Sequence, residues 1–420
     1  MLDILFISPY YPPYIYGGAE VSTSILIHHL AKKVKRKVIT SALTDKAWTH
    51  DGVQVIPLFK VIGLGNRTFN DLISYGMKVL FFPWLNGWLL FRYLQKHRPE
   101  LIHLVPNGYH FIGQLLVIKL LKIPVMIDIR DFTWVCLSDF SFKFDAKQTF
   151  TKHNCFNHLS SSYTSSNVLL QPFLSIIAIY ETLVFTLYMG LIKILVNNSK
   201  LIQLTAISQY TKDRLSEAGF KADNINVISN IMSPQKQSQV PRKKEFVFAG
   251  RVEKSKGVWE LIKAFQLADI SDFSLSIYGD GTELPAIKKY VAEHKISSVN
   301  LKGRQSPDFI MSAYHSCFAI IATPYRPEPL GRYILDSFRS LTPLITTNNG
   351  GQIEFITHEK NGVLVSPQNV SELSNAMRKL AHDKKLYTKI CNKLKKLPES
   401  LKIDSIVKKR LSIYLTLTAQ

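Results

Sequence analysis

The sequence is poor in cysteine and lacks the short motifs that usually mark a metal or nucleotide site. Four cysteines are scattered over 420 residues, which is too few for a disulfide framework, and no CxxC pair suggests zinc. The dinucleotide fingerprint GxGxxG and the Walker sequence are both missing. This pattern fits a protein of a reducing cytoplasm.

Acidic residues are also scarce relative to basic ones. Lysine and arginine number 52 against 31 for aspartate and glutamate, which gives a formal charge of +21. Such a surface attracts phosphate-rich partners, namely nucleic acid, anionic lipid or nucleotides. Charge does not choose among them, but no nucleic-acid reading module is recognisable, so we do not expect nucleic acid as a partner.

The N-terminal segment has no basic stretch of the kind that opens a signal peptide. MLDILFISPYYPP begins at once as a buried strand, so we expect the protein to stay on the side where it is made. Two apolar stretches complicate this expectation. Val168–Val196 reaches the length of a membrane span but contains charged residues, and Leu72–Arg98 is broken by Pro83 and Gly87. We favour amphipathic or buried helices over true spans for both.

The length allows two or three domains, and the pattern predicts two similar halves. Short apolar runs typical of strands alternate with stretches of helical spacing, first from Leu2 and again after the polar segment Ser233–Glu245. This alternation predicts an α/β fold of two Rossmann-like, doubly wound domains that face a central cleft. We predict an N-terminal domain over 1–200, a C-terminal domain over 201–395, and a helical tail over 396–420 that packs back on the N-terminal domain.

Three loops that follow predicted strands contain candidate binding residues, because open parallel sheets bind ligands outside the carboxyl ends of their strands. In YIYGGAE, Gly17 and Gly18 precede a helix and let backbone N–H groups approach an anion, with a tight turn as the equal alternative. In AGRVEKSKG, Arg251 and Lys256 lie at a strand end and a helix start, where both can bind one phosphate group. The alternative for this pair is simple solvation.

The third loop, PYRPEPLGRYILDSF, contains two acidic residues. Glu328 lies in the loop, and Asp336 lies about one and a half turns into the following helix. One carboxylate can therefore lie at the reacting end of a ligand while the other contacts a different part of it. Taken alone, this spacing is more often a helix-start charge and a surface residue.

Four motifs together resemble the retaining glycosyltransferases of family 4, which have the GT-B fold. In order, they are GGAE, GRVEKSKG, PYRPEPLGRYILDSF and TNNGGQIEFITHEKNGVLVSPQNVSEL. The resemblance implies that Arg251 and Lys256 hold the diphosphate of a nucleotide sugar, and that Glu328 lies near the donor sugar. It also implies that Asp336 contacts the ribose, although this residue is one methylene shorter than the family's usual glutamate.

The resemblance also bears on the leaving group and on metals. Backbone N–H groups of Leu330 and Gly331 would help to stabilise the departing phosphate. No DxD sequence occurs, so we infer a metal-independent enzyme without a cofactor, in which positive side chains and helix ends offset the developing charge. The region between Cys136 and Cys155 matches no standard zinc spacing, so we predict no metal ligands.

The first domain departs further from the family pattern. RDFTWVC has Arg130 where relatives commonly have a histidine, and it keeps the following Asp131. Arginine cannot act as a base near neutral pH, so Arg130 would contact a phosphate or the donor sugar, or else form a local ion pair with Asp131. His103, at the end of another strand, is a secondary candidate whose alternative is a packed, hydrogen-bonded histidine.

We therefore predict a retaining glycosyltransferase of the hexosyltransferase type. It would move a sugar from a nucleotide-sugar donor to a glycan or lipid-linked acceptor, in surface polysaccharide or glycolipid synthesis. The alternative is a catalytically impaired nucleotide-sugar-binding protein, because Arg130 and Asp336 depart from the family pattern. We expect the protein in the cytoplasm, at the inner face of the membrane, with a peripheral contact to anionic lipid.

Overall fold

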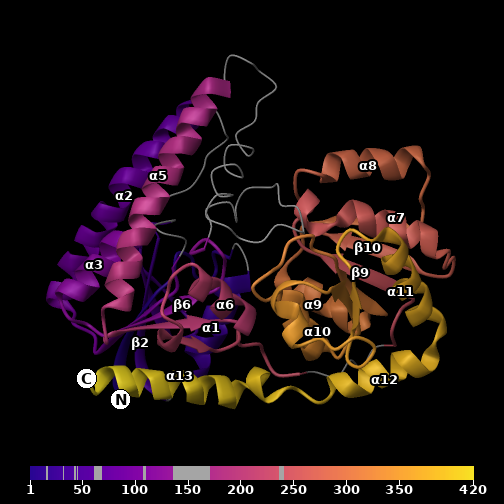
Figure 1. The fold of residues 1–420 in the computed structure, drawn as a ribbon. Helices are drawn as coiled ribbons and strands as arrows, with labels where there is room; N and C mark the ends of the chain where they lie inside the picture. Colours follow the sequence, from indigo (N-terminus) through magenta and orange to yellow (C-terminus); the bar gives the residue numbers. More distant parts are fainter. Residues whose placement is uncertain are drawn as a thin grey trace. The chain divides into compact units, whose positions relative to one another are not determined.

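The computed structural model divides into two compact units, each described here by itself (Figure 1). The first unit extends to Ile231 and includes the C-terminal segment Ser400–Gln420, and the second comprises Met232–Glu399. The structure describes residues 1–15, 18–31, 33–41, 44, 46–60, 69–106, 110–135, 171–235 and 241–420, with residues 69–79 and 171–178 described by their backbone alone.

The first unit is built on an eight-stranded sheet with the order β3-β4-β2-β1-β5-β6-β7-β8. All neighbouring strands are parallel except for the antiparallel pair β3 and β4. The strands are β1 (Leu2–Ile7), β2 (Val34–Ser41), β3 (Trp48–His50), β4 (Val53–Phe59), β5 (Leu101–Leu104), β6 (Val125–Ile129), β7 (Ile202–Ala206) and β8 (Ile225–Val227). The strand order reverses at β1, which lies between β2 and β5.

Helices cover both faces of this sheet, which is why its central strands β1, β5 and β6 are mostly apolar without alternation. In β1, Leu5 and Ile7 join one buried cluster, whereas Ile4 and Phe6 join another on the opposite face. In Figure 1, α2 and α5 run alongside each other, near α3. The helices are α1 (Gly18–His29), α2 (Phe69–Lys96), α3 (Ile112–Leu120), α5 (Gln171–Asn197), α6 (Gln209–Glu217), the short η2 (Ala222–Asn224) and α13 (Ile403–Thr418).

The second unit is built on a six-stranded parallel sheet with the order β11-β10-β9-β12-β13-β14. Its strands are β9 (Glu245–Ala249), β10 (Ser274–Tyr278), β11 (Val299–Gly303), β12 (Ala319–Ala322), β13 (Leu344–Thr347) and β14 (Val363–Val365). Its helices are η3 (Lys254–Lys256), α7 (Val258–Ala268), α8 (Leu284–Glu293), α9 (Pro307–Ser316), α10 (Arg332–Ser340), η4 (Gly350–Glu354), α11 (Val370–His382), α12 (Lys384–Leu394) and η5 (Glu399–Leu401).

Both units therefore have the predicted doubly wound α/β architecture, but the division between them differs from the predicted one. The sequence pattern predicts a boundary between residues 200 and 201. In the structure β7 pairs with β6 and β8 pairs with β7, so residues 201–231 continue the first unit. In the tail, α13 packs against β5, β6 and β7, and its Ile406, Val407 and Tyr414 are buried in the first unit's core.

Candidate active site

The candidate site lies in the second unit, at the point where the strand order of its sheet reverses. β9 lies between β10 and β12, and the connections that leave β9 and β12 run to opposite sides. Open α/β sheets bind ligands in the crevice that such a reversal leaves at the carboxyl ends of the strands. The loop after β9 contains Arg251 and Lys256, and the loop after β12 contains Glu328.

Lys256 and Glu328 form an ion pair across these two loops. The Lys256 ammonium donates a hydrogen bond to Oε1 of Glu328. The two side chains keep 26% and 16% of their surface exposed, so the pair is largely shielded and yet open to a ligand. The structure therefore brings together two predicted site residues that lie far apart in the sequence.

A close approach at Gly257 holds the two loops against each other. Gly257 has a φ of +69°, and a Cβ atom there would lie 2.3 Å from the carbonyl oxygen of Thr323. Only glycine fits this position, because the approach and the left-handed conformation both exclude a side chain. The Tyr325 N–H also donates to the Ser255 carbonyl, at 3.0 Å.

A third loop, after β13, supports Glu328 from the other side. Gly350 has a φ of +69°, and a Cβ atom there would lie 2.5 Å from both the backbone N and O of Glu328. The next residue, Gly351, donates its N–H to the Glu328 carbonyl at 2.8 Å, and the Asn349 side-chain amide donates to the Tyr325 carbonyl at 3.0 Å. The sequence reasoning gave these residues no separate role, although the glycine pair in TNNGG was the available signal.

Arg251 is the more exposed of the two predicted phosphate ligands. Its side chain is 65% exposed, and one terminal nitrogen lies 3.0 Å from Oε1 of Glu253, which is nearly buried. The carboxylate of Glu253 can thus orient the guanidinium while leaving most of it open to an anion. Sequence reasoning missed Glu253, which looked like one more polar residue of the loop.

Asp336 lies on α10, one turn after Arg332. The Arg332 Nε is 3.7 Å from Oδ1 of Asp336. Burial raises the pKa of Asp336, against the opposing charges of Arg332 and Arg339. Leu330 and Gly331 are buried immediately before this helix, where its first N–H groups are expected to attract an anion.

In the first unit, Arg130 pairs with Asp128 rather than with Asp131. Its Nε and one terminal nitrogen donate to Oδ2 of Asp128 at 3.1 and 2.8 Å, and the other terminal nitrogen donates to Thr23 Oγ1 at 2.8 Å and to the Ala19 carbonyl at 2.5 Å. Arg130 therefore anchors the N-terminal half of α1, and only 6% of its side chain is exposed.

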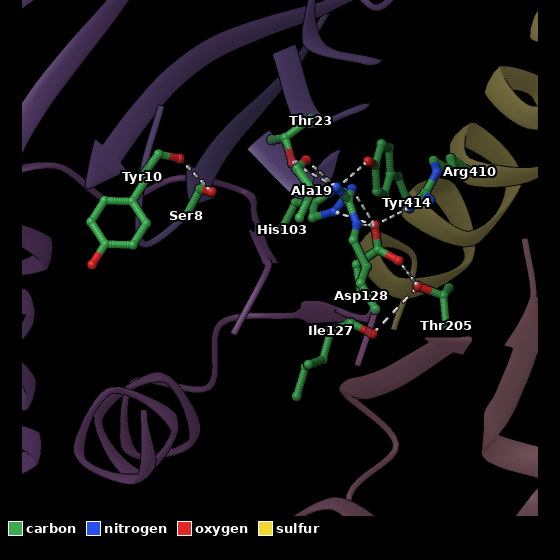
Figure 2. A network of polar contacts seen from close by, with 11 residues as sticks. Ser8, Tyr10, Ala19, Thr23, His103, Ile127, Asp128, Thr205, Arg410 and Tyr414 are labelled. Atoms are coloured by element: carbon green, nitrogen blue, oxygen red, sulfur yellow. Dashed lines mark hydrogen bonds and ion pairs between the residues drawn. The ribbon is translucent and has the colours of Figure 1, made fainter. Parts of the chain in front are cut away.

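Asp128 is the centre of a buried polar network that the sequence did not reveal (Figure 2). Arg410 of α13 reaches Oδ2 of Asp128 at 3.0 Å, and the Thr205 hydroxyl donates to Oδ1 at 3.0 Å. Burial by itself would raise the pKa of Asp128, but Arg130 and Arg410 hold it well below its usual range. The available signal was a carboxylate in the middle of the apolar strand VMIDI, which needs a partner.

His103 belongs to the same network and is fully buried. Its Nδ1 lies 2.6 Å from the Tyr414 hydroxyl, and its Nε2 lies 3.5 Å from Oδ2 of Asp128. Burial lowers its pKa to about 4, although the Asp128 carboxylate acts in the opposite direction. The structure therefore places His103 as the alternative interpretation described it, as a packed and hydrogen-bonded histidine.

Acid should destabilise the first unit through His103. The folded chain keeps this residue neutral down to about pH 4, whereas an unfolded histidine takes up a proton below about 6.5. The free energy of unfolding should therefore fall as the pH is lowered between these values, by roughly 1.4 kcal/mol per unit. Urea unfolding at several pH values measures the slope. His103→Gln should reduce this pH dependence only in part, because burial also lowers the pKa of His110 to about 4. If the slope in His103→Gln equalled that of the parent, this account would be refuted.

Some predicted residues lie outside the described part of the chain. Gly17 and both Cys136 and Cys155 belong to this group, whereas Gly18 is the first residue of α1. Among the residues that the structure describes, no three histidine, cysteine, aspartate or glutamate side chains gather to form a metal site.

The comparison with protein families bears directly on the second unit. Residues 232–397 match the model of the family described as glycosyl transferases group 1. This segment matches the group 1 glycosyltransferases, and we refer to it below as the glycosyltransferase domain. It contains Arg251, Lys256, Glu328 and Asp336, together with the β13 loop that supports Glu328.

The chain spans about a third to a half of the length of the curated relatives that it matches. An uncharacterized glycosyltransferase of Methanocaldococcus jannaschii is 30% identical over 140 residues, which cover 33% of this chain and 39% of the relative. The lipopolysaccharide core biosynthesis glycosyltransferase LpsE of Rhizobium meliloti is 27% identical over 199 residues, which cover 43% of this chain and 54% of the relative.

Solved structures resemble the chain over nearly all of its length. Anabaena HepE, in complex with UDP and glucose, has a TM-score of 0.67 at 17% identity and covers 98% of this chain and 99% of its own. Sucrose-phosphate synthase from Thermosynechococcus elongatus has a TM-score of 0.66 at 16% identity and covers 100% of both chains. This likeness confirms the predicted GT-B fold.

Outside the glycosyltransferase domain, the first unit has a small pocket of about 60 Å³ at its own point of strand reversal. Residues at the carboxyl ends of β1 and β5 line it, together with Lys60 after β4 and Asn86 of α2. The side chain of Gln114 also lines the pocket and is 6% exposed, and its Oε1 has no hydrogen-bond partner among the described residues. Such a buried acceptor calls for a donor from water or a ligand.

Proposed function

We propose that this protein is a retaining, metal-independent glycosyltransferase of family 4. It transfers a hexose from a nucleotide-sugar donor to a glycan or a lipid-linked acceptor, in the synthesis of a surface polysaccharide or glycolipid. The observation that carries this proposal is the Lys256–Glu328 pair at the strand reversal of the glycosyltransferase domain. The four motifs of the sequence support the family assignment.

In this proposal Arg251 and Lys256 bind the diphosphate of the donor. Arg251 offers a fork of donors held by Glu253, and Lys256 offers a compact charge that phosphate oxygens would share with Glu328. Backbone N–H groups of Leu330 and Gly331 assist at the start of α10, and Asp336 contacts the ribose. HepE, a structural relative, was solved in complexes with UDP, with UDP-glucose and with UDP and glucose, which supports a nucleotide-sugar donor here.

The proposed mechanism follows from retention of the configuration at the anomeric carbon of the sugar. The bond between the anomeric carbon and the phosphate oxygen breaks, the acceptor oxygen bonds to that carbon on the same face, and the departing phosphate takes the acceptor proton. The protein then needs no general base of its own. It stabilises the charges instead, because Lys256 and Arg251 offset the negative charge on the phosphate and Glu328 stabilises the positive charge on the sugar.

We propose that neither a metal ion nor a cofactor takes part. The sequence has no DxD motif for a metal-bound diphosphate, and the cations of the β9 loop can offset the same charge. Unchanged transfer in excess chelator would support this part of the proposal, and loss of transfer that magnesium restores would refute it.

We assign the acceptor to the first unit and the protein to the cytoplasmic face of a membrane. The pocket lined by Gln114 offers a buried hydrogen-bond acceptor for a hydroxyl donor, which suits a sugar. LpsE acts in lipopolysaccharide core biosynthesis, which supports a lipid-linked or surface glycan acceptor. The excess of basic residues supports a peripheral contact with anionic lipid.

A thermal-shift screen with UDP-, GDP- and ADP-sugars tests donor binding. One nucleotide class should raise the melting temperature, since a ligand at a hundredfold excess over its Kd stabilises the folded state by about 2.7 kcal/mol. Lys256→Ala should abolish the shift. Lys289→Ala should keep it, because Lys289 forms a comparable but exposed pair with Glu293 on α8. No shift with any nucleotide sugar would refute the proposed donor site.

Donor hydrolysis separates the enzyme from its alternative, a catalytically impaired binding protein. Slow release of free sugar with net retention requires a working site, so a purified protein that binds the donor and releases sugar supports the enzyme. Donor binding without any release or transfer of sugar would favour the impaired protein. Arg130 and Asp336, which depart from the family pattern, support this alternative.

A further inference from the structure

The outer face of α2 exposes large apolar side chains in a continuous row. Phe81, Trp84, Leu85 and Trp88 are 58%, 46%, 36% and 52% exposed. Their spacing of three, four and seven residues places all four on one face of the helix. Scattered surface hydrophobes need no explanation, but an aligned row with two tryptophans marks a contact surface.

The helix cannot roll to bury this row, because its opposite face is closely packed on α3. A Cβ atom on Gly87 would lie 2.7 Å from the backbone of Gly113, and one on Gly113 would lie 2.0 Å from the Pro83 carbonyl. Leu90 and Leu94 on the same side are buried in the core. The outward direction of the apolar row is therefore built into the packing of the unit.

The neighbouring helix α5 has a similar exposed stripe. Ile179, Leu183, Leu187 and Ile194 are each more than half exposed, and the Trp84 indole N–H donates to the hydroxyl of Tyr188 on α5 at 3.2 Å. Within the described part of the chain, one segment is long and apolar enough to cross a membrane, Ile179–Asn197, with a mean hydropathy of 1.7.

The buried side of α5 argues against a crossing. Val184, Met189, Ile192 and Val196 belong to the core of the first unit, and the carboxyl group of Glu181 is on the buried side as well. A helix that spanned a bilayer would have to withdraw these residues from the core of the first unit. α5 therefore belongs to the surface of the first unit, and we expect it to lie along a membrane without crossing it.

The positive charge around this exposed face favours an anionic membrane as its binding partner. The segment Leu72–Arg98 contains four basic residues and no acidic one, and the Arg92 guanidinium lies 5.3 Å from the ring centre of Trp88. Apolar and aromatic side chains flanked by cations fit the boundary between the headgroups and acyl chains of an anionic bilayer. A second copy of this chain fits less well, since like charges would meet across the contact.

We propose that the α2 face formed by Phe81, Trp84, Leu85 and Trp88 inserts shallowly into an anionic membrane, with α2 and α5 both lying on the membrane without spanning it. Arg92 then binds lipid phosphate next to the inserted tryptophan. This deepens the peripheral contact proposed above by naming its surface and its depth. It does not depend on sugar transfer.

Co-sedimentation of the full chain with vesicles tests the proposal. The protein should bind vesicles that contain phosphatidylglycerol, bind phosphatidylcholine vesicles at least about tenfold more weakly, and be released by high salt. Phe81→Ser combined with Trp88→Ser should weaken binding by at least about tenfold. The matched control, Leu267→Ser combined with Phe309→Ser, removes two similarly exposed side chains from the second unit and should bind like the parent.

Three results would overturn the proposal. First, the double α2 variant and the parent could bind vesicles equally well. Second, the bound protein could be released from the vesicles by detergent but not by salt. Third, sedimentation velocity could show a dimer of the parent that the α2 variant abolishes. The thermal-shift response to the donor, measured on the same variants, tests the donor site separately from the membrane contact. A folded α2 variant should still respond to the donor, and vesicle binding without any donor response would refute the donor site alone.

Discussion

Glu328→Gln is expected to lower kcat/KM for sugar transfer by about a hundredfold or more. The substitution keeps the size of the side chain but removes the negative charge that pairs with Lys256. Since the loops after β9, β12 and β13 hold Lys256 and the Glu328 backbone in place, the fold should be unaffected. The loss should fall mainly on kcat, because the charge on Glu328 acts on the sugar as its positive charge develops.

Lys256→Ala should be as damaging but should also raise the KM for the donor. This residue binds phosphate before the reaction and offsets the leaving group's charge during it, so both constants depend on it. The effects of Lys256→Ala and Glu328→Gln should be non-additive, because each substitution already breaks the same pair. Arg251→Ala belongs to the same test and should mainly weaken donor binding.

Glu293→Gln and Lys289→Ala are the matched controls for this experiment. They alter an exposed ion pair on α8, in the same domain, with 3.7 Å between the charged groups. Such a pair contributes little to stability, so both variants should transfer sugar like the parent. Normal turnover in Glu328→Gln, Lys256→Ala and Arg251→Ala would refute the proposed site.

The sequence predicted the elements of the second unit well because its signals are local. Helices were expected near Gly257, Leu284, Pro307 and Gly331, and α7, α8, α9 and α10 begin at Val258, Leu284, Pro307 and Arg332. Proline and glycine at these starts restrict or free the backbone in ways that do not depend on the rest of the chain. The loops that follow β9 and β12 were therefore predicted in the right context.

The domain division was harder to predict because it depends on which strands pair. The segments LIQLTAIS and NINVISN look like the opening of a new α/β unit, and only their pairing with β6 makes them β7 and β8 of the first sheet. The position of Glu328 depends similarly on Gly350 and Gly351, which come from a third strand end. A pattern in one sequence predicts where a strand ends but not which strand ends meet.

The Asp128 network is the clearest case of information that the sequence does not display. Arg410 and Tyr414 read as ordinary residues of a basic C-terminal helix, and their partners Asp128 and His103 lie on strands near the middle of the first unit. The network is visible only once α13 packs on β5, β6 and β7.

Arg410→Met is expected to destabilise the first unit by about 3 to 5 kcal/mol, the usual cost of removing one partner from a buried ion pair. The methionine fills much of the same space, so the loss comes from the charge. Asp128 would keep Arg130, which limits the damage, whereas Asp128→Asn would leave two buried guanidinium groups without their carboxylate and should cost more. Tyr414→Phe removes only the hydroxyl next to His103 and should cost about 1 kcal/mol.

Urea unfolding followed by tryptophan fluorescence suits this test. Four of the five tryptophans belong to the first unit, so the signal reports mainly on that unit: Trp48, Trp84, Trp88 and Trp134. Lys409→Met is the matched control, since it removes an exposed charge from the residue next to Arg410 on the same helix, and it should unfold like the parent. If Arg410→Met and Lys409→Met unfolded at the same urea concentration, Arg410 would add nothing to the attachment of α13, and the buried pair with Asp128 would lose its assigned role.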